Sequence, residues 1–129
     1  MSKPNVDGIT LYATDLVIKE NKVYIGSQIT QNAPGVLFIW AKWCGHCTKF
    51  IPTFNSIDKK IGHKFIMLHI EESELKKRPE VARALNVQGF PTIKFFDQYN
   101  EVQADYVGSR DEASLLNSIC KIYHYCYSQ

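Results

Sequence analysis

The chain has 129 residues, of which 45% are hydrophobic and 22% are charged, and its formal net charge is +2. This length and composition are typical of one globular domain with a sizeable core. The small charge and the scattered basic residues argue against binding to nucleic acid or to an anionic membrane, and no apolar stretch is long enough to cross a bilayer. The single basic run, residues 76–78, is interpreted as a solvated helix face.

The predicted elements begin with strands. Residues 16–18 and 23–25 are β-rich, and Glu20-Asn21 between them favours a hairpin turn. Residues 26–35 are typical of a loop. The run Val36-Leu37-Phe38-Ile39-Trp40-Ala41 is apolar throughout, which predicts a central strand that is buried on both faces.

The middle of the chain predicts a long helix and then a strand. Apolar residues recur at helical spacing over residues 50–61, and Pro52 should kink this helix. Residues 64–70 are the next expected strand. Ser73 is then expected to cap a helical segment that Pro79 interrupts or restarts.

The last third of the chain predicts two strands and a final helix. Residues 92–96 and 102–107 are expected to be strands, and Ser109 with Glu112 fits a capping box for the helix that follows. The apolar face of that helix consists of Leu115, Leu116, Ile119, Ile122 and Tyr123. The order of elements favours an α/β fold, in which a central mixed sheet has helices on both sides.

A Cys-x-x-Cys motif stands where the buried strand meets the long helix. Cys44 is expected at the helix N-terminus, where free backbone N–H groups and the helix dipole stabilise a thiolate. Cys47 lies one turn later on the same face, so Cys44 can attack a partner disulfide and Cys47 can resolve the mixed disulfide. His46 can donate a hydrogen bond, or carry charge, beside the Cys44 thiolate.

Two further cysteines bear on the question of a metal site. A bare Cys-x-x-Cys can also be half of a zinc site, but Cys120 and Cys126 are poorly spaced for the second half. We therefore expect no metal, and no cofactor beyond a redox-active Cys44–Cys47 pair. Cys120 is interpreted as a buried, inert thiol. Cys126 is expected to be exposed near the chain end, where an intermolecular disulfide is open to it.

The segment Trp43-Cys44-Gly45-His46-Cys47, together with Gly89-Phe90-Pro91-Thr92, resembles the thioredoxin superfamily. The pentapeptide is similar to that of protein disulfide isomerase domains, because ordinary thioredoxin has proline where His46 stands. The resemblance implies a thioredoxin fold. It also implies that Cys44 is the nucleophile and Cys47 the resolving cysteine.

The resemblance implies roles for residues around the cysteines. Pro91 matches the family's cis-proline, and a cis bond would offer backbone groups of Phe90 to an extended substrate. Trp43 is expected to be partly exposed within an apolar surface for peptides, and Gly45 is assigned to the same substrate-binding set. Arg110 matches an isomerase arginine that lowers the pKa of the resolving cysteine; the alternative is a solvated arginine at the start of the last helix.

One departure from the family pattern concerns proton transfer. The family usually has a buried acid six residues before the first cysteine, with a lysine on the neighbouring strand, and this chain has Phe38 and His69 there. The acid normally takes a proton from the resolving cysteine. Because it is absent here, Arg110 and solvent are expected to matter more for the deprotonation of Cys47. His69 is either a partial replacement or a plain strand histidine.

Two other departures concern architecture. The resemblance covers roughly residues 35–123 of an expected single domain, 1–129. Residues 1–34 are an N-terminal extension of strands, in which the hairpin at 16–25 takes the place of a full first helix. The segment 71–85 is longer than expected and could alter the rim near the cysteines.

Three functions stay open. The first is oxidation or isomerisation of protein disulfides, which the His46 motif supports. The second is a thioredoxin-like reductase that donates electrons to a cytosolic acceptor, and the third is a binding module without chemistry. The expected partners are protein or peptide thiols and disulfides, with glutathione or a reductase as electron partner, and a monomer is expected.

The chain ends set an expectation about location. Residues 1–18 lack a signal peptide and residues 125–129 lack an ER-retention tetrapeptide, which predicts a cytoplasmic protein. A specialised oxidising compartment or a viral particle is the alternative. In a reducing cytosol, the four cysteines are expected to be catalytic, metal-binding or buried rather than paired in structural disulfides.

Overall fold

A mixed sheet of five strands forms the centre of the protein, whose computed structural model describes residues 5–127. In spatial order the strands are β1 (Ile9–Thr10), β5 (Ile66–Glu71), β4 (Gly35–Trp40), β6 (Thr92–Phe96) and β7 (Val102–Asp105). Strands β1, β5 and β4 run parallel, while β6 and β7 are antiparallel to their neighbours. The chain ends on which the predicted location depends, residues 1–18 and 125–129, lie partly outside the described residues.

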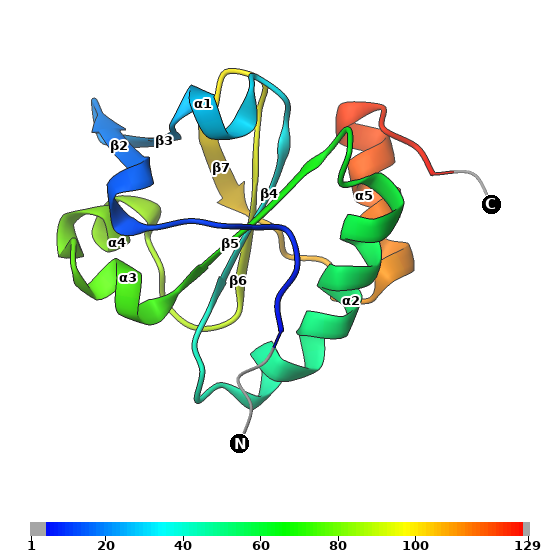
Figure 1. Ribbon diagram of the computed structural model, residues 1–129, viewed down its shortest axis with the longest axis horizontal. Helices are drawn as coiled ribbons and strands as arrows, with labels where there is room; N and C mark the ends of the chain where they lie inside the picture. Colours follow the sequence, from blue (N-terminus) through cyan, green and yellow to red (C-terminus); the bar gives the residue numbers. More distant parts are fainter. Residues whose placement is uncertain (1–4, 128–129) are drawn as a thin grey trace.

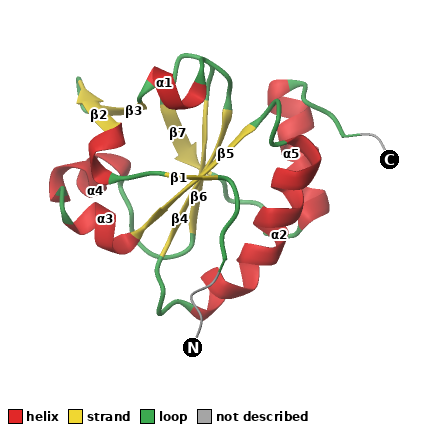
Figure 2. Cartoon of the chain, in the orientation of Figure 1, coloured by secondary structure: helices red, strands yellow, loops and turns green. Residues whose placement is uncertain are grey.

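Helices cover both faces of this sheet, which confirms the predicted layers. Helices α2 (Gly45–Ile61) and α5 (Glu112–Tyr123) lie on one face, as Figures 1 and 2 show. The other face carries α1 (Ser27–Thr30), α3 (Glu72–Lys76), α4 (Pro79–Leu85) and the hairpin of β2 (Leu16–Lys19) and β3 (Lys22–Ile25). The two faces give the protein two hydrophobic cores.

Strand β4 supplies side chains to both cores, because successive side chains on a strand point to opposite faces. Phe38 and Trp40 belong to the core under α2 and α5. Leu37 and Ile39 belong to the core under α3, α4 and the hairpin. All six residues of β4 are buried, so the continuous apolar run in the sequence correctly predicted a strand buried on both faces.

The N-terminal part follows the expected departure from the family pattern. The β2–β3 hairpin turns at Glu20 and Asn21, whose φ angles are +51° and +66°, as a tight two-residue turn requires. A helix does form inside the predicted loop, but α1 has only four residues. The chain therefore has both the hairpin and a very short first helix, whereas the sequence predicted the hairpin alone.

Both predicted serine caps are wrong, because an acidic residue takes the capping position in each case. The carboxylate of Glu71 accepts the backbone N–H of Ser73 at 2.9 Å, so α3 begins at Glu72. The carboxylate of Asp111 accepts the backbone N–H of Ser114 at 2.8 Å and caps α5. A carboxylate is at least as good a cap as a hydroxyl and also interacts favourably with the positive end of the helix dipole.

The predicted apolar face of α5 is only partly correct. Leu115 and Ile119 are buried against the core under α2, as expected. Ile122 is 56% exposed, because it lies at the edge of the apolar face of α5 and does not reach the core.

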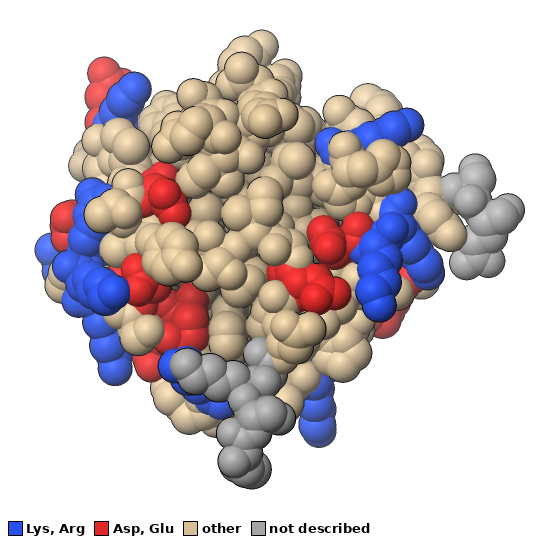
Figure 3. Space-filling view, in the orientation of Figure 1, with Lys and Arg blue, Asp and Glu red and all other residues tan. Residues whose placement is uncertain are grey.

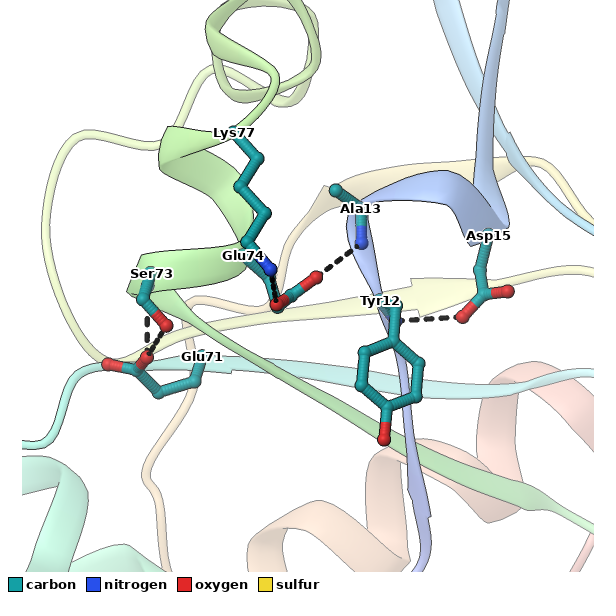
Figure 4. A network of polar contacts seen from close by, with 7 residues as sticks. All are labelled: Tyr12, Ala13, Asp15, Glu71, Ser73, Glu74 and Lys77. Atoms are coloured by element: carbon teal, nitrogen blue, oxygen red, sulfur yellow. Dashed lines mark hydrogen bonds and ion pairs between the residues drawn. The ribbon is translucent and has the colours of Figure 1, made fainter.

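Helix α3 is fixed to the N-terminal segment by a polar network (Figure 4). The carboxylate of Glu74 accepts the backbone N–H of Ala13 at 2.9 Å and the ammonium of Lys77 at 2.6 Å. Arg78 donates to the carbonyls of Ala13 and Leu16 at 2.8 and 2.6 Å. In the basic run, Lys76 and Lys77 are therefore exposed to solvent, as predicted. Arg78 instead links the end of α3 to the N-terminal segment.

Candidate functional site

Cys44 and Cys47 lie together at the start of α2, where the sequence places them. Cys44 is the N-cap residue, and its Sγ accepts the backbone N–H of Cys47 at 3.2 Å. Neither sulfur is in a disulfide. Cys44 is 6% exposed and Cys47 is 0% exposed, so only Cys44 presents any surface to a partner.

The Cys47 thiol is held in its protonated form by its surroundings. Burial raises the pKa of Cys47 to about 12, and the hydrogen bond and charge of Cys44 act in the same direction. Among the charged side chains, the guanidinium of Arg110 acts in the opposite direction and lowers this pKa. Arg110 thus lies close enough to influence Cys47, although it is exposed in the loop before α5.

The position six residues before Cys44 is filled by packing rather than by an acid. Phe38 is fully buried, and its ring centroid lies 5.0 Å from that of Phe50 and 5.2 Å from that of Phe54. These contacts close the space beneath the start of α2 with apolar surface. Phe38 therefore contributes to the dry environment that keeps the neighbouring Cys47 neutral.

His69 lies opposite Phe38 on the neighbouring strand β5, as the resemblance to the family pattern predicted. Its Nδ1 accepts the indole N–H of Trp40 at 3.2 Å, which leaves Nε2 as the protonated nitrogen that faces the Thr10 hydroxyl at 3.1 Å. Burial lowers the pKa of His69 to about 4. Because both ring nitrogens are engaged, the structure favours a structural strand histidine over a proton acceptor for Cys47.

Trp43 and Phe90 bring two distant segments together beside Cys44. The Trp43 side chain is 68% exposed, and its ring meets that of Phe90 edge-on at a centroid distance of 5.6 Å. Its indole N–H donates to the carboxylate of Glu72 at 2.9 Å. The Phe90–Pro91 peptide bond is cis, and the buried Pro91 directly precedes β6.

A mostly apolar groove of about 620 Å³ opens beside this aromatic pair. Its apolar lining consists of Trp43, Leu75, Pro79, Ala82, Val87 and Phe90. Helices α3 and α4 form its outer wall, so the long segment at residues 71–85 does shape the rim near the cysteines. The sequence predicted the altered rim but not that it would form a groove, since the walls come from Trp43 and from residues 72–90, which are far apart in the chain.

The remaining predicted site residues are exposed around Cys44. His46 lies in the first turn of α2, and no hydrogen bond joins its ring to another residue within the described range. Gly45 faces open space, where a Cβ would meet nothing within 4 Å. Arg110 lines a small hollow of about 240 Å³ together with Pro91 and Tyr106. Cysteines, cis-proline and arginine thus gather at one end of the sheet.

The interpretation of Cys120 as an inert thiol is wrong, because Cys120 forms a disulfide with Cys126. His124 ends α5 with a φ angle of +63° and donates its backbone N–H to the carbonyl of Cys120 at 3.0 Å. This left-handed residue turns the chain back, which brings the two Cα atoms to within 4.5 Å. The expectation that the cysteines avoid structural disulfides fails for this pair.

Within residues 5–127, no group of three or more His, Cys, Asp or Glu side chains is arranged to hold a metal ion. None of the helices found there is long and apolar enough to cross a membrane.

Comparison with known proteins agrees with this site. The profile of the thioredoxin family matches residues 16–121. Protein disulfide-isomerase tigA of Aspergillus niger is 29% identical over 114 residues, which are 88% of this chain and 29% of that protein. Protein disulfide-isomerase erp38 of Neurospora crassa is 31% identical over 107 residues, which are 83% of this chain and 26% of that protein. The chain therefore spans less than a third of the length of these two relatives.

A solved structure gives the same result for the fold. The crystal structure of Deadhead, a germline-specific thioredoxin of Drosophila melanogaster, has a TM-score of 0.59 and 29% identity, and it covers 74% of this chain and 86% of its own. The central mixed sheet with flanking helices is thus the thioredoxin fold. With a family profile that spans most of its length and relatives among the disulfide isomerases, this chain belongs to the thioredoxin family as a protein disulfide isomerase-like domain.

Proposed function

We propose that this chain is a thiol–disulfide oxidoreductase that acts on protein cysteines through Cys44 and Cys47, with a preference for oxidation and isomerisation. The observation that carries the proposal is the asymmetry of the pair. Cys44 caps α2 and keeps a small exposed fraction, whereas Cys47 is fully buried one turn later and donates its backbone N–H to the sulfur of Cys44. One cysteine is placed to attack and the other to resolve.

The proposed cycle begins with attack on a partner. The Cys44 thiolate attacks one sulfur of a substrate disulfide, so a Cys44–substrate bond forms and the second substrate sulfur leaves as a thiolate that takes a proton. Cys47 then loses its proton and attacks Sγ of Cys44, which releases the first substrate sulfur and closes the Cys44–Cys47 disulfide. Run in reverse, the same steps oxidise a substrate dithiol. When the substrate itself resolves the mixed disulfide, the result is isomerisation.

The substrate class follows from the groove beside Trp43 and Phe90. Its apolar walls favour an extended, partly apolar segment of an unfolded or folding protein. Glutathione or a protein reductase or oxidase would restore the redox state of the pair, and a monomer is sufficient for this cycle. His46 supports the oxidising preference, because a group that stabilises a thiolate also stabilises the reduced pair.

An oxidising compartment suits this proposal better than a reducing cytosol. Disulfides persist where the surroundings are oxidising, and the chain carries the Cys120–Cys126 disulfide away from the candidate site. The alternative is a thioredoxin-like reductase that donates electrons to a cytosolic acceptor. The likeness to a small thioredoxin over 86% of that structure favours this alternative.

The test is the reduction potential of the Cys44–Cys47 pair against glutathione, in a chain in which Cys120 and Cys126 are both replaced by Ser. A value near about −180 to −200 mV supports the oxidase or isomerase, and a value near about −270 mV supports the reductase. A pair that forms no disulfide at any ratio of reduced to oxidised glutathione contradicts both and leaves a binding module.

Two matched variants test the assigned roles on a scrambled disulfide substrate. Cys44→Ser should reduce activity to background. Cys47→Ser should keep the first attack and accumulate the mixed disulfide, because the resolving thiol is gone. Accumulation of a mixed disulfide in Cys44→Ser instead would mean that the roles of the two cysteines are exchanged.

A further inference from the structure

A second pocket lies at the opposite end of α2 from the candidate site. Its volume is about 400 Å³, which is within the range of about 300–1,000 Å³ for small-molecule sites. It is lined by Lys60, Ile61, His63, Lys64, His124, Tyr125, Cys126 and Tyr127. The end of α2 and the segment after α5 form its walls, at the side of the molecule where Figure 1 places the C-terminal end.

The charged side chains that line the pocket are cationic. They are Lys60 and Lys64, next to two histidines, and none of the residues that line the pocket is acidic. Lys60 forms an ion pair with Glu112, outside the lining, and its ammonium lies 5.3 Å from the centre of the Tyr127 ring. Lys64 is exposed and, in the part of the chain that the structure describes, has no carboxylate within ion-pair distance. Figure 3 shows lysine and arginine side chains on this side of the molecule, with acidic side chains next to some of them.

An accessible disulfide sulfur belongs to the same pocket. Cys126 is exposed and lines it, whereas its partner Cys120 is half-buried in the last turn of α5 and does not. A thiol that enters the pocket therefore reaches the sulfur of Cys126 first. Cys120 is then the leaving group, because an attacking thiolate displaces the other sulfur of the disulfide.

The two cysteine pairs cannot exchange electrons directly. Cys44 caps the first turn of α2, and Lys60 and Ile61 in the last turn belong to the pocket. A helix of 17 residues is about 25 Å long at about 1.5 Å per residue, far beyond the reach of one sulfur to another. Exchange at Cys126 thus needs a separate, diffusible thiol.

We propose that the Cys120–Cys126 disulfide is a second thiol-exchange site, which takes an anionic, low-molecular-weight thiol of the glutathione class into the basic pocket. The basic side chains attract the carboxylates of such a thiol, and the exposed sulfur of Cys126 receives its thiolate. This site is independent of the function proposed for Cys44 and Cys47.

The exchange consists of two displacements. A glutathione thiolate attacks Sγ of Cys126, so a glutathione–Cys126 bond forms, the Cys120–Cys126 bond breaks, and Cys120 leaves as a thiolate that takes a proton from water. A second glutathione thiolate attacks the glutathione sulfur of this mixed disulfide, which releases oxidised glutathione and the Cys126 thiolate. Two electrons pass from two glutathione molecules to the protein disulfide.

The experiment uses the full chain with Cys44→Ser and Cys47→Ser, so that only the second pair reacts. Its reduction is followed with glutathione and with 2-mercaptoethanol, a thiol that has no carboxylate, at one pH and ionic strength, and the mixed disulfide is located by peptide mapping after alkylation. We expect the adduct on Cys126. Both thiols attack as thiolates, but only glutathione also carries carboxylates, so we expect Lys64→Glu to lower the glutathione rate constant roughly fivefold and the mercaptoethanol rate constant less than about twofold.

The matched control is Lys59→Glu, which makes the same charge change at an exposed position of α2 that does not line the pocket. It should change the glutathione rate constant less than about twofold at about 0.15 M salt, since charges outside the pocket are screened. The proposal is overturned by an adduct on Cys120, by equal effects of Lys64→Glu on both thiols, or by equal effects of the two lysine variants.

Discussion

The two cysteine pairs lie beside opposite ends of helix α2, and their surroundings differ. At the N-terminal end, Cys44 and Cys47 are reduced and buried against aromatic side chains, and Cys47 is fully enclosed. At the C-terminal end, Cys120 and Cys126 form a disulfide, and the exposed Cys126 lines a pocket of basic side chains. The same cysteine chemistry thus has a buried, apolar environment at one end of α2 and a solvent-exposed, basic one at the other.

This difference shows what controls the reactivity of a cysteine in this fold. Burial raises the pKa of Cys47 to about 12, so its reactivity depends on the groups that can remove its proton. Cys126 has solvent around it, so access and the charge of the incoming thiol decide its reactivity. Changes at Phe38, at the Cys120–Cys126 disulfide and at Arg110 test whether burial and charge have these separate effects.

The largest effect is expected from Phe38→Glu at the buried end. A carboxyl group here loses the aromatic packing of Phe50 and Phe54 and enters an apolar space, so the free energy of unfolding should fall by about 3–5 kcal/mol in urea denaturation. The same carboxylate should accept the Cys47 proton, and release of a Cys44 mixed disulfide should become faster at neutral pH.

Phe38→Leu is the control for this change, because it removes the ring without adding an acid. It should lower stability less and leave the release rate of the mixed disulfide unchanged. Faster release in Phe38→Leu would mean that looser packing, and not the missing proton acceptor, limits Cys47.

The second prediction concerns the pH dependence of stability. Burial lowers the pKa of His69 to about 4, against 6.5 in the unfolded chain. Between these values the unfolded chain binds a proton that the folded protein does not, so the free energy of unfolding should fall as the pH drops from about 6.5 to about 4. The loss from this group is about 3 kcal/mol.

Denaturation curves at several pH values in this range test the prediction in wild type and in His69→Gln. The carboxylates titrate alike in both, so the difference between the two pH profiles reports His69. His63→Gln, at an exposed histidine, should keep the wild-type profile. A His69→Gln profile parallel to that of wild type would contradict a neutral, buried imidazole.

The third prediction concerns the disulfide at the exposed end. Replacing both Cys120 and Cys126 by Ser opens a short loop, with a sequence separation of 6, and should lower the free energy of unfolding by about 2 kcal/mol. Activity at the Cys44–Cys47 pair should not change, because that pair lies at the other end of α2. A loss of activity without a loss of stability would show that the two ends are coupled.

The smallest effect is expected from Arg110→Gln. This change removes the charge that lowers the pKa of Cys47, so release of the mixed disulfide at neutral pH should slow roughly threefold to tenfold. The release rate should rise with pH in both proteins, since more Cys47 is deprotonated, but the rise should lie at higher pH in the variant. Arg110→Lys should restore most of the rate; an unchanged pH profile in Arg110→Gln would leave this arginine with no part in the step.

The elements that came out as predicted are those whose signal is local and strong. The apolar run of β4 is too short for a buried helix and rich in bulky residues, and the helical spacing of α2 repeats over several turns. The helix caps were less certain, since Ser109 and Asp111 are both good capping residues two positions apart, and packing of the following turn selects between them.

The sequence by itself determined the fold class, the position of the Cys-x-x-Cys pair at a helix start and the segment that precedes Pro91. Each depends on neighbours in the chain, such as periodicity, helix termini and short motifs. Only the tertiary structure decided the groove beside Trp43, the engagement of both His69 nitrogens and the pairing of Cys120 with Cys126. These depend on where separate segments meet, and the reversal at His124 that joins the last pair is set by packing of Tyr123 and Tyr125 on Phe65, which no local pattern encodes.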